Sequence, residues 1–550
     1  MRIIKNTILM FLLLFNISYA DFCVMPPHDD LIKNDPTVLL KQKTILQTMQ
    51  RFDDKIDEPQ KIDLNFIQEL QMNKDGLSLN SFNVQTSFNV LAICFDTPDK
   101  KFVTPLTFFD SLMFSNNQET TNNLKFGSVK NYYLYNSYQR FNITFVILPS
   151  EIGAITLDSN YNYYVNNSYG LGQYPNNSQK AFEDILVKAD PLVNFADFDN
   201  DKNGYVDGVI VFHPGSGAEF SGNTQDIWSH KWSIYAKRYD NVWVQNYSMQ
   251  PEFWSATKPM TIGVVAHETG HLFGLPDLYD TDNSSRAIGK FSLMAGGSWN
   301  ISLGEKPAPI DGWCRKKLGN LFSEIVDIKS RNVNTTLLPS ENTPRIFRMS
   351  ITDKEYYLVE NLQNEGLPTK GIAIWRCDET YHGSGNNRNE WYPPTRMTNV
   401  NYWVALIQPN NLWELEKNIS SGKLGCLFTA GNSFTVAGQP SSSFYGRDSS
   451  LIEVTNIIQT NNPVQGTYTA TISTCDCPTQ GDINQDGNVD AFDISACVGV
   501  AFEGEEATQV AQCQYFLEDV NCDLIINSFD VITMINNVIR HKDFPKKFCQ

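Results

Sequence analysis

Histidine and basic side chains are scarce in this chain. It has 7 histidines in 550 residues, and 43 Lys and Arg stand against 61 Asp and Glu, so the formal net charge is −18. A surface with this balance repels phosphate backbones and anionic lipid head groups, and we expect neither nucleic acid nor an anionic membrane as a partner. Because 550 residues exceed what one ordinary hydrophobic core organises, the length predicts several domains.

Long apolar runs are missing except at the start. Residues 1–20 begin with Arg2 and Lys5, continue with an apolar run and end in a small-residue site at Ala20. This order is typical of a secretory signal peptide. No later stretch reaches the ~20 apolar residues that a membrane helix needs. The sequence therefore predicts a secreted, extracellular protein without a membrane span.

Cysteines and glycosylation sequons fit export. Eleven cysteines suit an oxidising compartment, and six of them crowd the last 76 residues, which predicts a terminal module stapled by disulfides. Because eleven is odd, at least one thiol has no partner within the chain. N-glycosylation is permitted at eight sequons, which are Asn142, Asn166, Asn176, Asn246, Asn283, Asn300, Asn334 and Asn418.

Two of the seven histidines stand in a metal-binding motif. In the sequence HETGH, His267 and His271 are four residues apart, so they lie on one helix face. Glu268 is the next residue after His267 along the same helix. Zinc accepts such nitrogens at ~2.0–2.1 Å and keeps one position open for water in a catalytic site. The ion lowers the pKa of that water to about 7, and Glu268 is expected to pass its proton to a leaving amine. The motif predicts a zinc endopeptidase with two histidine ligands and Glu268 as catalytic base.

The third zinc ligand is expected just after this helix. Gly274 and Pro276 predict the end of the helix, and a turn at Gly274 can return Asp277 to the metal. Asp277 is the predicted ligand; Asp280 or a carboxylate further downstream is the alternative. The other candidate histidines have no partner at ligand spacing and are expected to be structural or surface residues; they are His213, His230 and His382.

These residues carry a resemblance to a known family. HETGHLFGLPDLYD over 267–280, followed by SLMAGGSW over 292–299, is similar to the immune inhibitor A family of secreted zinc metallopeptidases, which belongs with the metzincin-like zincins. Motifs at 127–133, 226–232 and 371–379 extend the resemblance over about residues 88–380. The resemblance implies a zincin fold, protein substrates and a methionine turn at Met294 beneath the zinc.

The chain is expected to be multidomain, with five parts. After the signal peptide, residues 21–87 are polar and mostly helical in pattern, and their place before the first core strand predicts an inhibitory propeptide. Alternating strands and helices over 88–325 predict an α+β zincin catalytic domain. Short strands without a long helix over 326–474 predict an all-β domain, and a small α-helical calcium-loop module is expected over 475–550. Cys23 is a candidate thiolate latch on the zinc; the alternative is a disulfide.

An acidic loop in the catalytic domain has the alternation of a calcium site. Ca²⁺ takes six to eight hard oxygens at 2.3–2.6 Å, and a loop around the ion points every second residue inward. The alternative is a polar turn before the strand over 209–212. The predicted calcium ligands are the side chains of Asp199, Asp201, Asn203 and Asp207, with the carbonyl of Tyr205.

The C-terminal module contains a duplicated calcium loop. Residues 482–493 and 519–530 repeat one pattern 37 residues apart, and each runs into an apolar helix. The pair resembles a type I dockerin, which implies a cohesin-like protein partner through residues 478–541; the alternative is that calcium only stabilises the terminus. The predicted ligands are Asp482, Asn484, Asp486, Asn488 and Asp493, then Asp519, Asn521, Asp523, Ile525 and Asp530.

Two functions of other classes remain open at this point. One is a non-enzymatic adhesion or scaffold protein that keeps the zinc fold, and Glu268 argues against it because only proton transfer needs that residue. The other is a component of a polysaccharide-degrading complex, which the C-terminal module suggests. It would require paired catalytic carboxylates in a sugar cleft.

Overall fold

The computed structural model describes nine main stretches of the chain and a few isolated residues. They are 23–53, 62–74, 85–114, 127–149, 153–280, 284–351, 354–380, 403–442 and 452–474, with 494–495, 498, 528, 531–532 and 534–535. The predicted signal peptide, His382 and the ten predicted calcium ligands between residues 482 and 530 lie outside the described residues.

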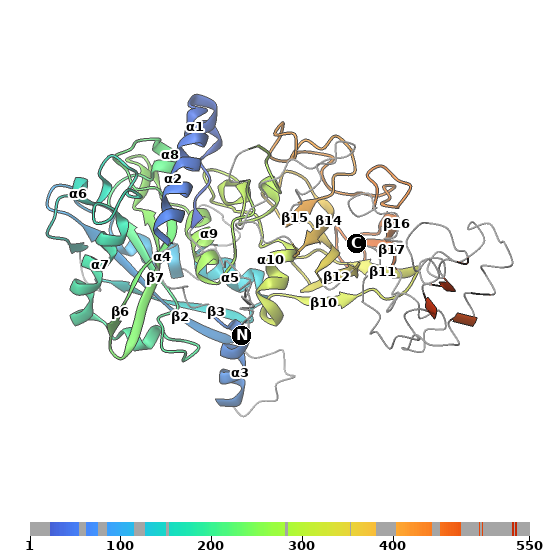
Figure 1. Cartoon of the computed structure of the whole chain (residues 1–550), viewed down its shortest axis with the longest axis horizontal. Helices are drawn as coiled ribbons and strands as arrows, with labels where there is room; N and C mark the ends of the chain where they lie inside the picture. Colours follow the sequence, from blue (N-terminus) through green and yellow to red (C-terminus); the bar gives the residue numbers. More distant parts are fainter. Residues whose placement is uncertain are drawn as a thin grey trace, which may run out of the picture.

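A mixed seven-stranded sheet forms the centre of the first unit (Figure 1). The two central strands, β2 and β5, are apolar and largely buried and pair in parallel, as continuous apolar runs predict. The pairs β6–β7 and β1–β6 are antiparallel. The strand order places β1 at one edge of the sheet. The order is β1 (Cys23–Val24), β6 (His230–Tyr239), β7 (Val242–Pro251), β5 (Val209–His213), β2 (Thr86–Asp96) and β3 (Phe141–Leu148), with β4 (Ile155–Thr156) paired to β2; a separate hairpin joins β8 (Phe253–Ser255) and β9 (Lys258–Pro259).

Helices alternate with these strands, which confirms the mixed α/β pattern predicted for this part of the chain. Asn177 begins α7 by accepting a hydrogen bond from the Lys180 amide, a good N-cap. No helix among the described residues is long and apolar enough to cross a membrane. The helices are α4 (Leu106–Phe114), α5 (Val129–Asn136), α6 (Tyr161–Val165), α7 (Ser178–Ala189), α8 (Ala218–Ser221), α9 (Ile262–Leu272) and α10 (Gly312–Lys317).

The N-terminal segment is helical after its first strand, as its pattern predicts. It contains α1 (Asp29–Asn34), α2 (Thr37–Asp53) and α3 (Leu64–Lys74). Val24, Met25 and Val38 are fully buried and belong to the same hydrophobic core as the central sheet. The segment is therefore packed into the first unit rather than standing apart from it.

The second unit is built from strands, which confirms the β-rich prediction. From β10 (Glu324–Asp327) to residue 474 the described residues form no helix. In β13, Leu358 faces the core of the first unit while its neighbour Val359 faces a second core, the period-two alternation of a strand buried on both faces. One sheet has the order β10, β12 (Arg345–Ser350), β13 (Glu355–Leu362), β14 (Gly371–Asp378), β15 (Val404–Leu406), and the other β11 (Val333–Leu337), β17 (Tyr468–Ser473), β16 (Glu453–Gln459).

A buried ion pair joins the two units. Arg315 of α10 contacts Glu360 of β13, and both side chains are almost completely buried. Glu360 Oε1 also accepts hydrogen bonds from the Gly312 amide (2.7 Å) and from Trp375 Nε1 (2.8 Å). Each charge is thus compensated, which a buried pair requires.

Four cysteines of the described residues are thiols buried in the hydrophobic core. Cys94, Cys314, Cys377 and Cys426 form no disulfide, and burial raises the pKa of each. The six cysteines of the predicted C-terminal module lie outside the described residues.

Candidate metal centre

The HETGH motif lies on α9, as its spacing requires. Every residue of this helix is buried, because it packs against β6 and β7. Met294, the predicted methionine turn, lies against it: a Cβ on Gly270 would stand 2.8 Å from Met294 Sδ. The Met294 carbonyl accepts a 2.7 Å hydrogen bond from the Leu278 amide, which joins this turn to the chain that follows the helix.

The two motif histidines face each other with their Nε2 atoms 3.1 Å apart. His267 Nδ1 lies 2.8 Å from the Leu293 carbonyl, and His271 Nδ1 lies 2.7 Å from the Leu275 carbonyl. A carbonyl oxygen can only accept, so each Nδ1 carries its proton and each Nε2 of the neutral ring presents a lone pair. Two lone pairs facing each other at this distance fit a metal ion that accepts both.

Asp277 completes a set of three donor atoms. The helix ends at Leu272, Gly274 adopts φ +80°, and the chain turns so that Asp277 Oδ1 lies 3.1 Å from His267 Nε2 and 3.2 Å from His271 Nε2. Three atoms at these mutual distances suit ligands placed ~2.0–2.1 Å from one ion. The alternative, Asp280, accepts hydrogen bonds from Ser284 Oγ (2.8 Å) and the Ser285 amide (2.7 Å).

The protonation states of this set suit a metal. Burial opposes the charge of Asp277, but the adjacent histidines outweigh burial and lower the pKa of that carboxyl to about 2. Burial lowers the pKa of His267, which keeps its ring neutral. A carboxylate and neutral imidazoles are the forms that bind divalent cations.

Glu268 is a buried carboxyl whose oxygens have no hydrogen-bond partner among the described residues. Burial raises its pKa well above the ordinary value, and the charges of Asp277 and Glu219 raise it further. A buried polar group without a partner is costly, and in a native fold such a group often has a chemical role. It follows His267 directly on α9, so the helix that carries two of the donor atoms also carries a candidate proton acceptor.

The N-terminal segment lies over this centre. Cys23 Sγ and one ligand atom each of His271 and Asp277 all lie within 4.8 Å of one another. β1 holds the cysteine there through the antiparallel pairs Cys23 with Lys231 and Val24 with His230. Sequence reasoning considered Cys23, and the structure brings it to the metal centre.

Three aromatic side chains that sequence reasoning missed hold this segment by its carbonyls. Tyr279 donates to the Val24 carbonyl, Trp228 Nε1 to Met25 (2.7 Å) and Trp299 Nε1 to Pro26 (2.9 Å). All three lie within the motifs that carry the family resemblance, which was the only signal in the sequence that could have found them.

The predicted calcium loop is a turn of buried acids before β5. Asp199 Oδ2 accepts from the Gly204 amide (3.1 Å), Asp207 Oδ2 accepts from the Asn200 amide (2.6 Å), and Gly204 adopts φ +89° within the same turn. Burial, opposed by Asn200 and aided by the neighbouring acids, raises the pKa of Asp207 to about 7. The Tyr205 amide donates to Asn203 Oδ1 (2.8 Å). The predicted ligands Asp199, Asp201, Asn203, Tyr205 and Asp207 are thus close neighbours in one turn.

Two of the remaining histidines are structural, as predicted. His213 Nδ1 lies 3.2 Å from Tyr161 Oη, and His230 Nε2 lies 3.0 Å from Ser178 Oγ, both inside the core. Burial lowers the pKa of both rings, that of His230 to about 4. Neither takes part in the metal centre.

Comparison with known proteins agrees with this geometry. Residues 99–321 match the family model described as immune inhibitor A peptidase M6, catalytic domain. Immune inhibitor A of Bacillus thuringiensis subsp. alesti is 27% identical over 188 residues, which cover 28% of this chain and 26% of that protein. The pre-pro-metalloprotease PrtV of Vibrio cholerae serotype O1 (strain M66-2) is 26% identical over 246 residues, 38% of this chain and 26% of that protein.

The similarity covers the metal centre but only part of each protein. The chain spans about a quarter of the length of these relatives. The helix α9, Asp277 and Met294 all lie inside the matched range. Residues 99–321 are therefore similar to a peptidase M6 catalytic domain, and one of the relatives carries the name of a metalloprotease.

Proposed function

We propose that this protein is a secreted zinc endopeptidase that is made with an inhibitory N-terminal segment. The observation that carries the proposal is the convergence of three donor atoms, His267 Nε2, His271 Nε2 and Asp277 Oδ1, at 3.1–3.2 Å from one another. The same helix carries the buried carboxyl of Glu268, which has no hydrogen-bond partner within the described part of the chain. The match to a peptidase catalytic domain supports the same function. The names of the relatives, which include a pre-pro-metalloprotease, support export and a propeptide.

The proposed role of each residue in catalysis follows from the chemistry of its side chain. Zinc held by His267, His271 and Asp277 would supply a Lewis acid for the scissile carbonyl and lower the pKa of water. Glu268 accepts a proton from the attacking water and delivers it to the amine that leaves. The raised pKa of Glu268, caused by burial, makes it a stronger base than an exposed glutamate once it is ionised.

Latency is proposed to come from Cys23. A Cys23 thiolate would compete with the attacking water for the metal, and the buried position of β1 would block the approach of a substrate. Because β1 pairs with the edge of β6, it occupies the place where an extended peptide would add a strand. Removal of the segment frees both the metal position and the sheet edge.

The proposal also includes a structural calcium ion and a docking partner. A calcium ion in the loop over 199–207 would neutralise buried acids and brace the turn before β5. The C-terminal module, with its two predicted calcium loops, would dock the enzyme to a cohesin-like partner through residues 478–541.

Casein zymography with and without a chelator tests the function. We expect a clear band that the chelator abolishes and that zinc restores. A band that survives the chelator points to a different protease mechanism. No casein cleavage by any form of the protein favours an adhesion or scaffold role, and release of reducing sugar from polysaccharide favours the carbohydrate complex.

A further inference from the structure

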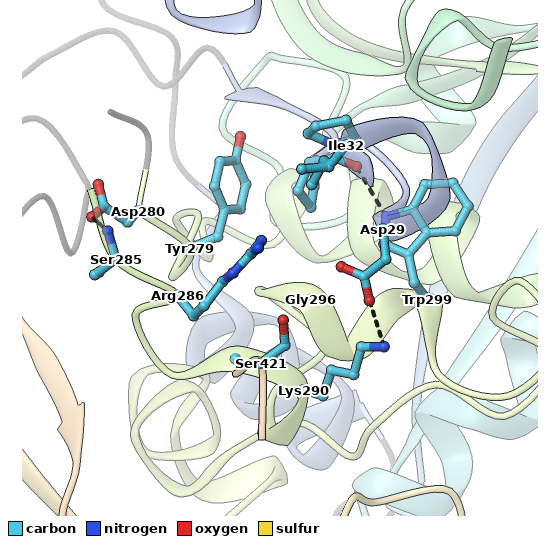
Figure 2. A pocket seen from close by; sticks show the side chains of 13 residues that line it. Asp29, Ile32, Tyr279, Asp280, Ser285, Arg286, Lys290, Gly296, Trp299 and Ser421 are labelled. Atoms are coloured by element: carbon cyan, nitrogen blue, oxygen red, sulfur yellow. Dashed lines mark hydrogen bonds and ion pairs between the residues drawn. The ribbon is translucent and has the colours of Figure 1, made fainter. Parts of the chain in front are cut away.

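A pocket lined by two cationic side chains lies at the chain segment that follows Asp277 (Figure 2). Tyr279 forms part of its wall and stands two residues after the metal-facing Asp277. Arg286 and Lys290 line it from the loop that leads to Met294. The N-terminal segment covers it with Pro26, Pro27, Asp29 and Ile32.

Asp29 of the N-terminal segment places a carboxylate in this pocket. Its Oδ2 lies 2.7 Å from Lys290 Nζ, and both side chains are about two-thirds buried. Burial opposes the charge of Asp29, but the hydrogen bond and the charge of Lys290, with the charge of Arg286, lower the pKa of the carboxyl. The pocket therefore accommodates an ionised acid.

Arg286 has donor capacity that the segment does not use. Its Nε is buried and has no hydrogen-bond partner among the described residues, and Figure 2 shows the side chain extending between Tyr279 and Asp29. The Arg286 amide donates to the Leu415 carbonyl (2.8 Å) and the Lys290 amide to that of Ser421 (2.7 Å), so the second unit fixes the loop. Guanidinium and ammonium groups held in place in this way are suited to carboxylates.

The charge balance of the pocket depends on the segment. Asp280, the other acid in the wall, accepts hydrogen bonds from Ser284 and Ser285. With the segment in place, two carboxylates, Asp29 and Asp280, line the pocket together with Arg286 and Lys290. Without Asp29 only one carboxylate remains, and the pocket carries a net positive charge.

We infer that this pocket is a substrate subsite that selects an acidic side chain, Asp or Glu, and that Asp29 occupies it in the latent protein. The inference rests on the proposed peptidase function. The segment passes over the metal at Cys23 and reaches the pocket six residues later, within ~20 Å along an extended chain. A peptide that replaces the segment therefore brings a side chain to the same pocket.

Matched peptides test the selectivity. The form of the protein that degrades casein is given quenched fluorescent peptides that differ only by Glu or Gln, with this position moved along both sides of the cleaved bond. We expect the Glu peptide to be cleaved with about tenfold higher kcat/KM at one position, and the ratio to shrink in high salt. Equal rates for Glu and Gln at every position would overturn the inference.

Variants connect the preference to the pocket. Lys290→Gln and Arg286→Gln should each bring the Glu-to-Gln ratio toward one, and Lys290→Arg should keep it. Lys188→Gln is the matched control, because Lys188 of α7 also pairs with an acid, Asp158 (2.8 Å), and should keep the full ratio. A tenfold ratio that survives both Gln variants would assign the selectivity elsewhere. Absence of casein cleavage by every form of the unaltered protein, the processed form included, would instead refute the peptidase function itself.

Discussion

The Nε2 atoms of His267 and His271 lie 3.1 Å apart while both Nδ1 atoms are engaged by backbone carbonyls. The carbonyls belong to Leu293 and Leu275, which lie outside the helix that carries the histidines. The orientation of both rings is therefore set by the loops around α9. Such supporting hydrogen bonds fix the tautomer of histidines that bind metals, and they orient the two Nε2 atoms toward the same position.

Glu268 is expected to be required for turnover but not for metal binding. Glu268→Gln should lower kcat/KM by about 10²–10⁴, the usual contribution of general base catalysis, with zinc content unchanged by metal analysis. His267→Ala should lose zinc as well. Glu183→Gln on α7 serves as the control. Substantial activity in the Glu268→Gln protein would show that another group accepts the proton.

Asp277 is expected to hold the metal as a third ligand. Asp277→Ala should lower zinc affinity by at least about tenfold in competition with a chelator, because one of three donors at 3.1–3.2 Å is lost. Asp280→Ala is the comparison, since Asp280 bonds Ser284 and Ser285. If Asp280→Ala weakened zinc and Asp277→Ala did not, the role would belong to Asp280.

Cys23 is expected to keep the full-length protein inactive. Cys23→Ser should raise the casein-degrading activity of the unprocessed protein, because a hydroxyl is a much weaker zinc ligand than a thiolate. Cys426→Ser, which removes a buried thiol of the second unit, is the control. The purified 21–87 segment should also inhibit the mature enzyme when added separately. Equal activity of the Cys23→Ser and unaltered proteins would leave blockage by the segment alone as the cause of latency.

Glu219 is expected to make stability depend on pH. Burial raises the pKa of this carboxyl to about 7, although Ser229 donates to both its oxygens (2.6 and 3.0 Å). The folded state thus binds the proton more tightly than the unfolded state, so this contribution is full below pH 4.5 and is lost as the pH rises through 7. The loss amounts to about 3 kcal/mol.

Glu219→Gln should remove this dependence. The free energy of unfolding should be measured with denaturant at several pH values. Between pH 4.5 and 7 the unaltered protein should lose stability relative to the variant. Glu183→Gln should follow the unaltered protein. Parallel curves for Glu219→Gln and the unaltered protein would mean that Glu219 is ionised in the folded state.

The acidic loop before β5 is expected to bind calcium. Calcium should raise the melting temperature of the protein, because a ligand that binds only the folded state stabilises it. Asp199→Asn and Asp201→Asn should each reduce that rise, whereas Asp158→Asn, an exposed acid paired with Lys188, should not. If calcium raised the melting temperature of both loop variants as much as that of the unaltered protein, the calcium site would lie in another part of the chain.

The local features of the metal centre could be predicted from the sequence. A four-residue spacing on a helix dictates that His267 and His271 share a face, and Gly274 with Pro276 dictates that the helix ends. The alternating apolar pattern likewise predicted the β-rich second unit, because strand periodicity is a local property. The position of the helix and the shared face of its two histidines needed no tertiary information.

Contacts between distant residues were decided only by the tertiary structure. The spacing left Asp277 and Asp280 as alternatives, and the turn at Gly274 together with the Leu278–Met294 hydrogen bond brings Asp277 to the histidines. Cys23 reaches the metal centre because β1 pairs with β6, more than 200 residues later in the chain. Asp29 of α1 likewise meets Lys290, a residue far away along the chain. Such pairs have no signature in local sequence, since backbone pairing and side-chain packing across the whole core determine which distant residues meet.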